Sequence, residues 1–163
     1  MFREMRRAAQ ALSKEECEEI LKRHGEGVLA VSGDDGYPYA VPLNYVYADG
    51  KLIFHCAKVG HKMDAMKSCD KASFCVIDAA DAVPEEYSTA YRSVIVFGRV
   101  KILTKAEEII PYLHAIGAKF TKDDEEARMK YMKPLLSQVA VVVLHPEHIS
   151  GKEGRLLAMQ RKS

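Results

Sequence analysis

Two tight turn signals divide residues 28–57 into three extended segments, and they constrain the fold more than any other feature of the sequence. The first turn signal is Asp34-Asp35-Gly36, and the second is Asp49-Gly50, between Ala48 and Lys51. An acidic residue followed by glycine favours the left-handed backbone of a short hairpin. The segments between and beside these turns are rich in aliphatic and aromatic residues. The sequence therefore predicts three consecutive strands joined by hairpins.

Prolines refine the prediction for the middle segment, which resumes an extended chain after the first turn. Pro38 and Pro42 lie four residues apart within it. Proline cannot donate a backbone hydrogen bond and is excluded from a helix interior. In a sheet it is confined to edge strands or bulges. We therefore expect this segment to lie at an edge of the sheet or to carry a bulge.

A helix is predicted before the first strand. Ser13-Lys14-Glu15-Glu16 reads as a capping box, in which the Ser13 hydroxyl accepts from the Glu16 amide and the Glu16 side chain reaches back. Apolar residues then follow at helical spacing, with Cys17, Ile20 and Leu21 on one face. Gly25 and Gly27 are expected to stop this helix.

The remaining elements mix helices and strands without regular alternation. A short helix is expected over 60–69, with Met63 and Met66 facing inward, and a strand over 72–78. Residues 78–91 read as polar and irregular, and 93–103 as a long strand interrupted at Gly98. Thr104 is expected to cap a helix, and a second helix ends near Leu136. Residues 139–144, without alternation, predict a last strand that is buried on both faces.

This order argues against a doubly wound parallel sheet, in which helices alternate with strands. Consecutive hairpins with accessory helices instead predict an α+β protein that is mainly antiparallel β, built as a closed or split barrel. With 163 residues, no internal repeat and no obvious linker, the chain is expected to form one domain over 1–163. The segments 1–12 and 154–163 are expected to be tails.

Composition excludes several classes of function. The formal net charge is +1, which gives no electrostatic reason to expect a nucleic acid or an anionic membrane as partner. No apolar run approaches the ~18 residues of a transmembrane helix, and the basic start lacks the apolar segment of a secretory signal. The cysteines form no CxxC pair, so we expect reduced, mostly buried thiols and a cytoplasmic protein.

The stretch FHCAKVGHK, residues 54–62, concentrates the reactive side chains. A metal site is not favoured, because His55 and Cys56 are adjacent on a strand and point to opposite faces. His145 and His148 are expected in a loop, and nothing in the sequence places them near His55. An anion site is an alternative, since Gly60-His61-Lys62 opens a helix whose free amides attract phosphate. A strand end with solvated charges is the third interpretation.

A family resemblance favours the anion site. VPLNYVYADGKLIFHCAKVGHKMDAM, residues 41–66, resembles the flavin-binding segment of the pyridoxamine 5′-phosphate oxidase-like family, and is most similar to its Nim-type nitroimidazole-resistance branch. YRSVIVFGRVKIL, residues 91–103, resembles the family's long strand, and HPEHISGK, residues 145–152, its terminal strand. The resemblance runs from about residue 26 to 152.

The resemblance implies a split β-barrel homodimer that binds FMN at the dimer interface. It places the first group of site residues along the flavin ring and its ribityl chain: Val41, Pro42, Leu43, Asn44, His55, Cys56 and Ala57. It implies that Gly60, His61 and Lys62 hold the 5′-phosphate and that Ser93 lies near the flavin. His55 is the one catalytic candidate, and a packing role that only shapes the pocket is its alternative. No metal is implied.

Departures from the family pattern limit the implied activity. Oxidases that act on pyridoxamine phosphate carry an arginine near the position of Ala40, and His61 stands where they carry another. The expected function is therefore an FMN-dependent oxidoreductase that uses a reductant to reduce a small electron-poor molecule, such as a nitro compound. Alternatives are a non-catalytic flavin-binding carrier or sensor, and a barrel whose pocket takes another phosphorylated ligand or a heme or deazaflavin cofactor.

Overall fold

We describe a computed structural model of the chain, which covers residues 2–122 and 124–161. The ends of the expected tails, Met1, Lys162 and Ser163, lie outside these residues. The strands are β1 (Glu26–Ser32), β2 (Pro38–Asn44), β3 (Val46–Ala48), β4 (Lys51–Ala57), β5 (Lys71–Val83), β6 (Ser88–Leu103) and β7 (Val139–Glu153). The helices are α1 (Lys14–Arg23), α2 (His61–Ser68), α3 (Ala106–Phe120), α4 (Glu125–Met132) and α5 (Arg155–Gln160).

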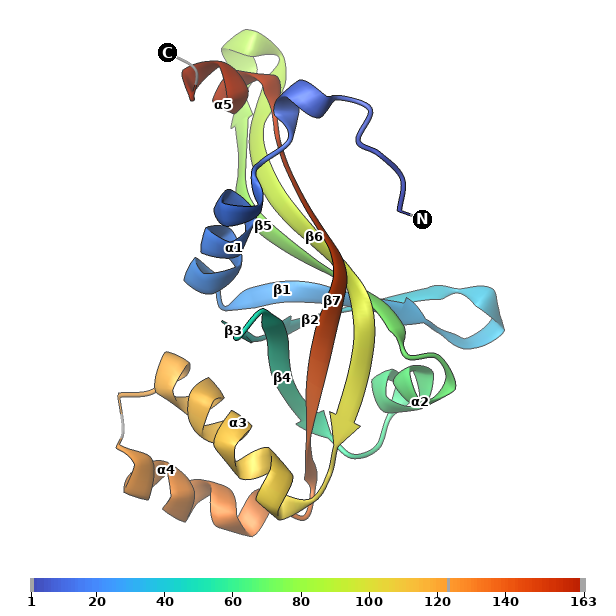
Figure 1. The fold of residues 1–163 in the computed structure, drawn as a ribbon, viewed down its shortest axis with the longest axis vertical. Helices are drawn as coiled ribbons and strands as arrows, with labels where there is room; N and C mark the ends of the chain where they lie inside the picture. The colour runs from blue at the N-terminus through green and yellow to red at the C-terminus, as the bar shows by residue number, and fades with distance from the viewer. Residues whose placement is uncertain (1, 123, 162–163) are drawn as a thin grey trace.

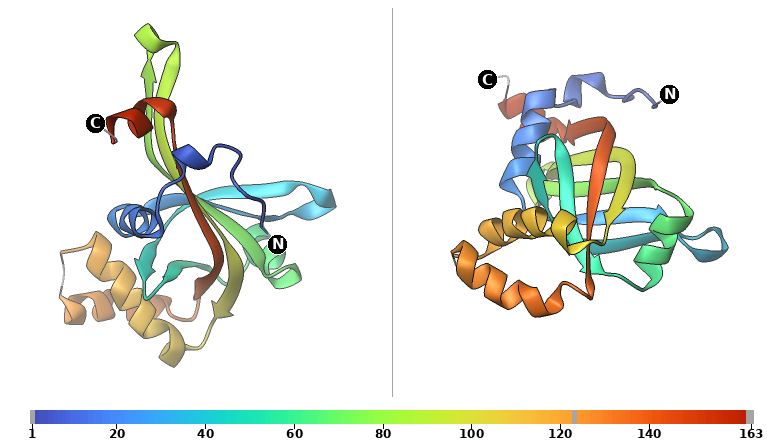
Figure 2. Two further views of the ribbon diagram at one scale, coloured as in Figure 1. Left: turned by 45° about the horizontal axis from the view of Figure 1, so that its top comes forward. Right: turned by 60° about the horizontal axis from the view of Figure 1, so that its bottom comes forward.

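All seven strands belong to one antiparallel sheet with the order β2-β1-β5-β6-β7-β4-β3. The sheet curves round on itself, as Figure 2 shows, and forms a split β-barrel with helices around it. This confirms the predicted fold class. The edge position of β2 also confirms the expectation from Pro38 and Pro42, since β2 pairs only with β1.

The middle extended segment is two strands, and this corrects the prediction of one. β2 ends at Asn44 and pairs with β1, whereas β3 begins at Val46 and pairs with β4 at the opposite end of the strand order. The chain crosses between them at Tyr45, which is fully buried. Its amide donates to Gly25 O at 2.8 Å and its hydroxyl to Leu21 O at 2.8 Å. Tyr45 is thus the residue at which the chain passes from one edge of the split barrel to the other.

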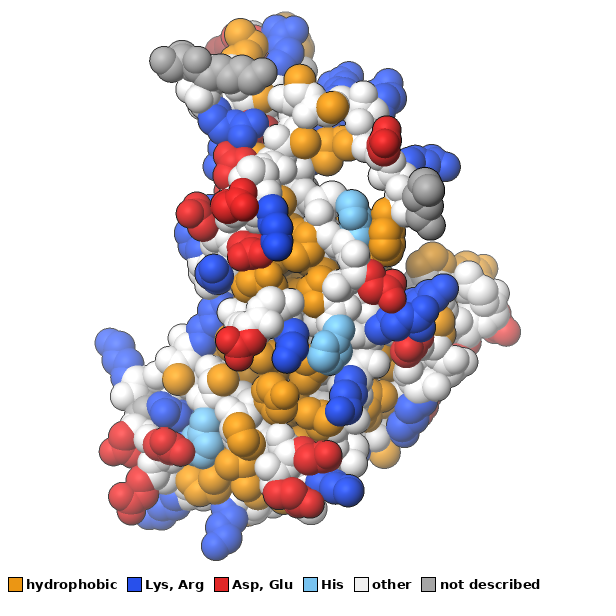
Figure 3. Space-filling model, viewed as in Figure 1, with side chains coloured by type: hydrophobic (Ala, Val, Ile, Leu, Met, Phe, Trp, Pro, Cys, Tyr) orange, Lys and Arg blue, Asp and Glu red, His pale blue; other side chains and the backbone are white. Residues whose placement is uncertain are grey.

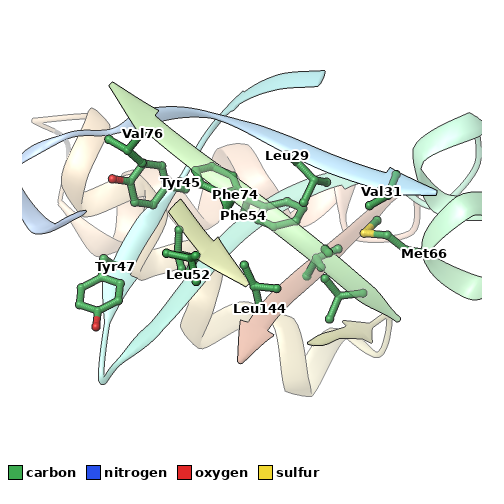
Figure 4. Packing of buried hydrophobic residues seen from close by; sticks show 14 of the residues in the cluster. Leu29, Val31, Tyr45, Tyr47, Leu52, Phe54, Met66, Phe74, Val76 and Leu144 are labelled. Carbon is green, nitrogen blue, oxygen red and sulfur yellow. The ribbon is translucent and has the colours of Figure 1, made fainter. Parts of the chain in front are cut away.

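The barrel interior holds one apolar core, shown in Figure 4. Phe74 lies at its centre, with its ring centroid 5.0 Å from that of Tyr45 and 6.3 Å from that of Phe54. Helix α1 packs at the Tyr45 end and α2 at the end marked by Val31 and Met66. A second cluster lies on the outer face of β3, β4 and β7, where α3 covers them.

The predicted starts and ends of the helices are partly wrong. The Ser13 capping box is present, but α1 ends at Arg23, before the glycines, with His24 in an extended conformation. Lys119 Nζ of α3 donates to the carbonyls of Lys22 (3.3 Å) and His24, so a tertiary contact finishes this helix. Thr104 does not cap α3, because the N-cap is Lys105 and no side chain bonds there.

Residues 78–91, expected to be irregular, form a projecting two-stranded arm between β5 and β6 (Figure 1). The register runs from Ala79 opposite Arg92 to Val83 opposite Ser88. Tyr87 closes the turn in the left-handed region at φ 45°. Both faces of the arm are largely open to solvent, so its sequence shows no alternation of apolar and polar residues. Its backbone groups nevertheless pair with each other across the arm.

The carboxyl-terminal segments also differ from expectation. His145 and His148 lie within β7 rather than in a loop, and β7 continues to Glu153. The interruption at Gly98 is a register shift, in which β7 has one extra residue opposite β6. Part of the expected tail folds as α5, and Arg161 after it bonds Glu16 of α1 at 2.8 Å. Residues 140–144 are buried, which confirms that this run is covered on both faces.

Candidate functional site

Strand β4 divides the site residues between the inside and the outside of the barrel. Phe54 and Cys56 point into the core, whereas His55 and Ala57 point outward. This alternation is the ordinary geometry of a strand. Burial raises the pKa of the Cys56 thiol. The Cys56 side chain therefore faces the core rather than any ligand outside the barrel, and its backbone is the part available for a contact there.

His55 lies where β4 meets a cavity, and its side chain is exposed. Partial desolvation lowers the pKa of His55, and the nearby positive charge of Lys62 lowers it further. The lowered pKa favours the neutral imidazole, which has one nitrogen able to donate and the other able to accept. Among the hydrogen bonds between described residues, none involves the His55 ring. The ring is thus available to a bound molecule.

Helix α2 begins at His61, one short turn after β4 ends at Ala57, and provides the candidate phosphate cradle. Gly60 is its N-cap with φ 113°, a conformation that favours glycine, and a Cβ atom placed there would meet nothing within 4 Å. The amides of Met63 and Asp64 bond back to Gly60 O at 2.8 and 3.1 Å. Lys62 is half-buried in the first turn. A ligand could therefore approach the backbone closely beside one positive charge.

His61, the other member of the predicted cradle, turns toward the β1–β2 hairpin. Its ring stacks on Tyr39, with centroids 4.1 Å apart and planes inclined by 19°. Its Nε2 atom lies 3.5 Å from Asp34 Oδ2. The structure therefore ties α2 to the hairpin through His61, and the side chain of Lys62 is the one whose charge reaches His55.

Strand β2 contributes an outward and an inward pair of site residues. Pro42 and Asn44 are exposed on the outer face, while Val41 and Leu43 pack against the core. Asn44 lines two hollows. One is a groove of about 410 Å³ that is lined by Glu26, Gly27, Val28, Pro42, Leu43, Asn44, Cys75 and Ile77. The other is the cavity of about 380 Å³ that contains His55. Asn44 thus lies at both the groove and the cavity.

Ser93 is separated from these hollows. It pairs with Ile77 on β5 and Lys152 on β7, and it lines neither of them. Because Ile77 is a groove residue, Ser93 lies one strand beyond the groove. The structure therefore places Asn44 and His55 at one cavity, and Lys62 is linked to them only through the effect of its charge on His55, whereas Ser93 lies outside this group.

Helices α3 and α4 supply cavity walls that the sequence did not assign to a site. Leu113, Ile116 and Phe120 come from α3, and Tyr131 and Met132 come from α4. The helical spacing of Leu113 and Ile116 signalled a buried face. Nothing local indicated that this face covers β4 beside His55, because that contact joins residues far apart in the sequence.

The described residues were searched for a metal site, a membrane-spanning helix and a disulfide bond. Within residues 2–122 and 124–161, no three His, Cys, Asp or Glu residues come together as a possible metal site. No helix in the described part of the chain has the length and apolar character needed to span a membrane. All four cysteines are free, with Cys17 and Cys56 buried and Cys69 and Cys75 half-buried.

The fold and these site residues were compared with known proteins. A sequence model of the pyridoxamine 5′-phosphate oxidase family matches residues 13–153. The chain belongs to this family. The match spans β1 to β7, so it includes both the cradle and the cavity. No curated protein sequence matches the chain.

Solved structures share the family fold with this chain. A candidate 5-nitroimidazole antibiotic resistance protein from Bacteroides thetaiotaomicron is 23% identical, with 88% of this chain and 86% of that chain covered and a TM-score of 0.74. A conserved hypothetical protein from Mycobacterium tuberculosis is 18% identical, with 94% and 92% covered and a TM-score of 0.80. An FAD-binding protein from Mesorhizobium loti is 24% identical, with 88% and 95% covered and a TM-score of 0.66.

Proposed function

We propose that this member of the pyridoxamine 5′-phosphate oxidase family is an FMN-dependent oxidoreductase that reduces a small electron-poor molecule, such as a nitro compound. The observation that carries the proposal is the amino-terminal end of α2, where Gly60 is open and Lys62 lies in the first turn, close enough to the end of β4 for its charge to act on His55. Structures with this fold include an FAD-binding protein and a candidate nitroimidazole resistance protein, which supports a flavin and a nitro acceptor.

The residues present fit a flavin phosphate at α2. Lys62 and the first amides of the helix attract an anion, and Gly60 leaves room for it. The backbone of Val41 to Asn44 and of Cys56 and Ala57 would supply hydrogen-bonding groups to the polar edge of the flavin ring. FMN, when bound, supplies hydride and electron transfer, while the protein supplies position and charge. His55 donates a hydrogen bond to the ring or to a substrate, or holds a proton at one ring nitrogen.

A homodimer is part of the proposal. The outer face of β5 and β6 exposes large apolar side chains: Ile77 is 60% exposed, and Ile95 and Phe97 are each 38% exposed. Phe2 lies beside them, with its ring centroid 5.6 Å from that of Phe97. Exposed apolar patches of this kind mark interaction surfaces. A second copy of the chain would cover this face and close the groove lined by Ile77 and Asn44. Sedimentation of a monomer at micromolar concentration would contradict this part.

A flavin-binding protein without turnover is the second candidate. It is favoured by the His55 ring, which no other described side chain orients by a hydrogen bond. A general acid or base is normally held in place by such a partner. In that case His55 shapes the pocket, and replacement by Asn leaves the reduction of the flavin unchanged.

Cofactor titration tests the proposal. FMN and riboflavin, which lacks the phosphate, are added to the protein while the flavin absorbance near ~450 nm is followed. Lys62→Ala is expected to weaken FMN binding about 10- to 100-fold, the effect of one charge-assisted contact. Riboflavin binding is expected to stay unchanged.

Lys67→Ala is the matched control, because Lys67 lies in the last turn of the same helix and is exposed. An equal loss in both variants would indicate general electrostatics instead of a cradle. Absence of FMN binding at tens of micromolar would refute FMN as the cofactor of this protein. Binding without turnover of NAD(P)H and 2-methyl-5-nitroimidazole would select the second candidate.

A further inference from the structure

The cavity of about 380 Å³ beneath the α3–α4 hairpin has no role in holding the phosphate and needs an explanation of its own. Its floor is the outer face of β4 and the start of β7, with His55 and Val139. Its walls come from α3 and α4, with Leu113, Ile116 and Met132 among them. Figure 3 shows hydrophobic side chains gathered between these helices and the sheet. The volume lies within the range of small-molecule sites.

Large apolar side chains at the mouth of the cavity are exposed to water. Phe120 is 45% exposed, Tyr131 is 75% exposed and Leu135 is 39% exposed, and all three line the cavity. Exposing so much apolar surface at one hollow is unfavourable unless an apolar molecule covers it. Leu113 and Ile116 pack in the second core cluster and also line the cavity, so the space lies directly beside a filled core.

The polar groups of the cavity are few and lie mainly at its floor. Asn44 and His55 supply an amide and an imidazole, and no Asp or Glu is among the lining residues. Asn44 Nδ2 donates a long hydrogen bond of 3.5 Å to Gly25 O, so its second amide hydrogen can reach a ligand. Thr121 and Arg128 also line the cavity, and Arg128 lies across Gly117, where a Cβ atom would come within 2.5 Å of its Cδ. Arg128 already has a partner, so its charge is not left for a ligand. A charged ligand would therefore lose its hydration among the apolar walls.

We propose that this cavity binds the electron acceptor, and that the acceptor is an uncharged, flat molecule of one or two rings with a carbonyl or nitro oxygen. That oxygen accepts a hydrogen bond from Asn44 or His55, and the rings lie between Leu113, Ile116 and Val139. The assignment as an acceptor rests on the proposed function, whereas binding in the cavity does not. For a quinone, two electrons and two protons pass from the reduced flavin, so that both C=O groups become C–OH and the flavin is left oxidised.

The test uses flavin-free protein and 2,3-dimethyl-1,4-naphthoquinone, whose blocked ring positions prevent addition to the cysteine thiols. Affinity is measured by isothermal titration calorimetry. Val139→Phe, which fills part of the cavity, is expected to weaken binding at least about tenfold. Val59→Phe makes the same change at a side chain that is 78% exposed and outside the cavity, and it should leave the affinity unchanged. Unchanged affinity in Val139→Phe overturns the proposal.

A second comparison tests the polar end of the cavity. 2,3-Dimethylnaphthalene has the same rings without the carbonyl oxygens and is expected to bind about fivefold more weakly than the quinone. Asn44→Leu should remove most of that preference while the hydrocarbon still binds. If Val139→Phe fails to fold by circular dichroism, Leu136→Trp fills the same cavity from another wall.

The last measurement separates the acceptor from the cofactor. Quinone affinity that persists in protein saturated with FMN supports separate sites. Competition between the two would place the flavin ring in this cavity and overturn the proposal. Quinone binding in a protein that fails to bind FMN would support the cavity and refute only the proposed cofactor.

Discussion

Gly27 is a position where a single methyl group should destabilise the barrel. A Cβ atom built there would clash with Phe74 Cε1 and would lie 2.9 Å from Phe74 Cζ and 2.8 Å from the Cys75 carbonyl oxygen. Phe74 is fully buried and cannot withdraw, because the rings of Tyr45 and Phe54 hold it at centroid distances of 5.0 and 6.3 Å. Overpacking of this kind costs about 1–3 kcal/mol. We expect Gly27→Ala to lie at the upper end, near 3 kcal/mol.

The reasoning is tested by a double-mutant cycle with Phe74→Leu. Leucine lacks the Cε1 and Cζ atoms that the new methyl group would strike, and by itself this truncation is expected to cost about 1–2 kcal/mol. Additive effects would total about 4–5 kcal/mol. We expect the double variant to lose only about 2–3 kcal/mol, since the ring clash is gone and the contact with the Cys75 carbonyl remains.

Urea denaturation followed by circular dichroism measures these free energies. With a slope of about 2 kcal/mol per molar urea, Gly27→Ala alone should lower the midpoint by about 1.5 M. Gly36→Ala is the control, because Gly36 has φ 81° and a Cβ there meets nothing. Its cost is backbone strain, which Phe74→Leu cannot relieve. A Gly27–Phe74 cycle additive within about 0.5 kcal/mol would refute the packing argument.

Two further predictions follow from titratable groups. Burial alone would raise the pKa of Asp78, but hydrogen bonds and charges from Arg23 and His24 lower it below the ordinary value of 3.8. Its stabilising effect is therefore present above that value and is lost as the pH falls through the folded pKa, so unfolding free energy between about pH 5 and pH 2 should depend less on pH in Asp78→Asn. The charge of Lys62 helps to lower the pKa of His55, so Lys62→Ala should raise it. Proton NMR titration of the imidazole resonances checks this. An unchanged pKa of His55 would show that the charge of Lys62 does not act on its ring.

The local features of this chain could be predicted from its sequence because their causes lie within a few residues. The Ser13 capping box, the turns at Asp34–Gly36 and Asp49–Gly50, and the start of α2 at Gly60 all depend on backbone preferences of adjacent residues. The unbroken apolar run at 140–144 likewise indicated a strand covered on both faces. These features were sufficient to predict an α+β barrel, whereas the phosphate cradle at Gly60 was one of three interpretations until the family resemblance favoured it.

Tertiary structure alone decided where the chain divides and which site residues meet. The break at Tyr45 depends on its bonds to Gly25 and Leu21, and the arm over 78–91 depends on pairing between two segments that show no apolar periodicity. Whether a strand residue faces the core or the solvent is fixed only when the sheet closes, so Cys56 turned inward while His55 joined a cavity roofed by α3 and α4. Contacts between distant segments cannot be read from local preferences, because the same apolar helix face can cover any exposed part of the sheet.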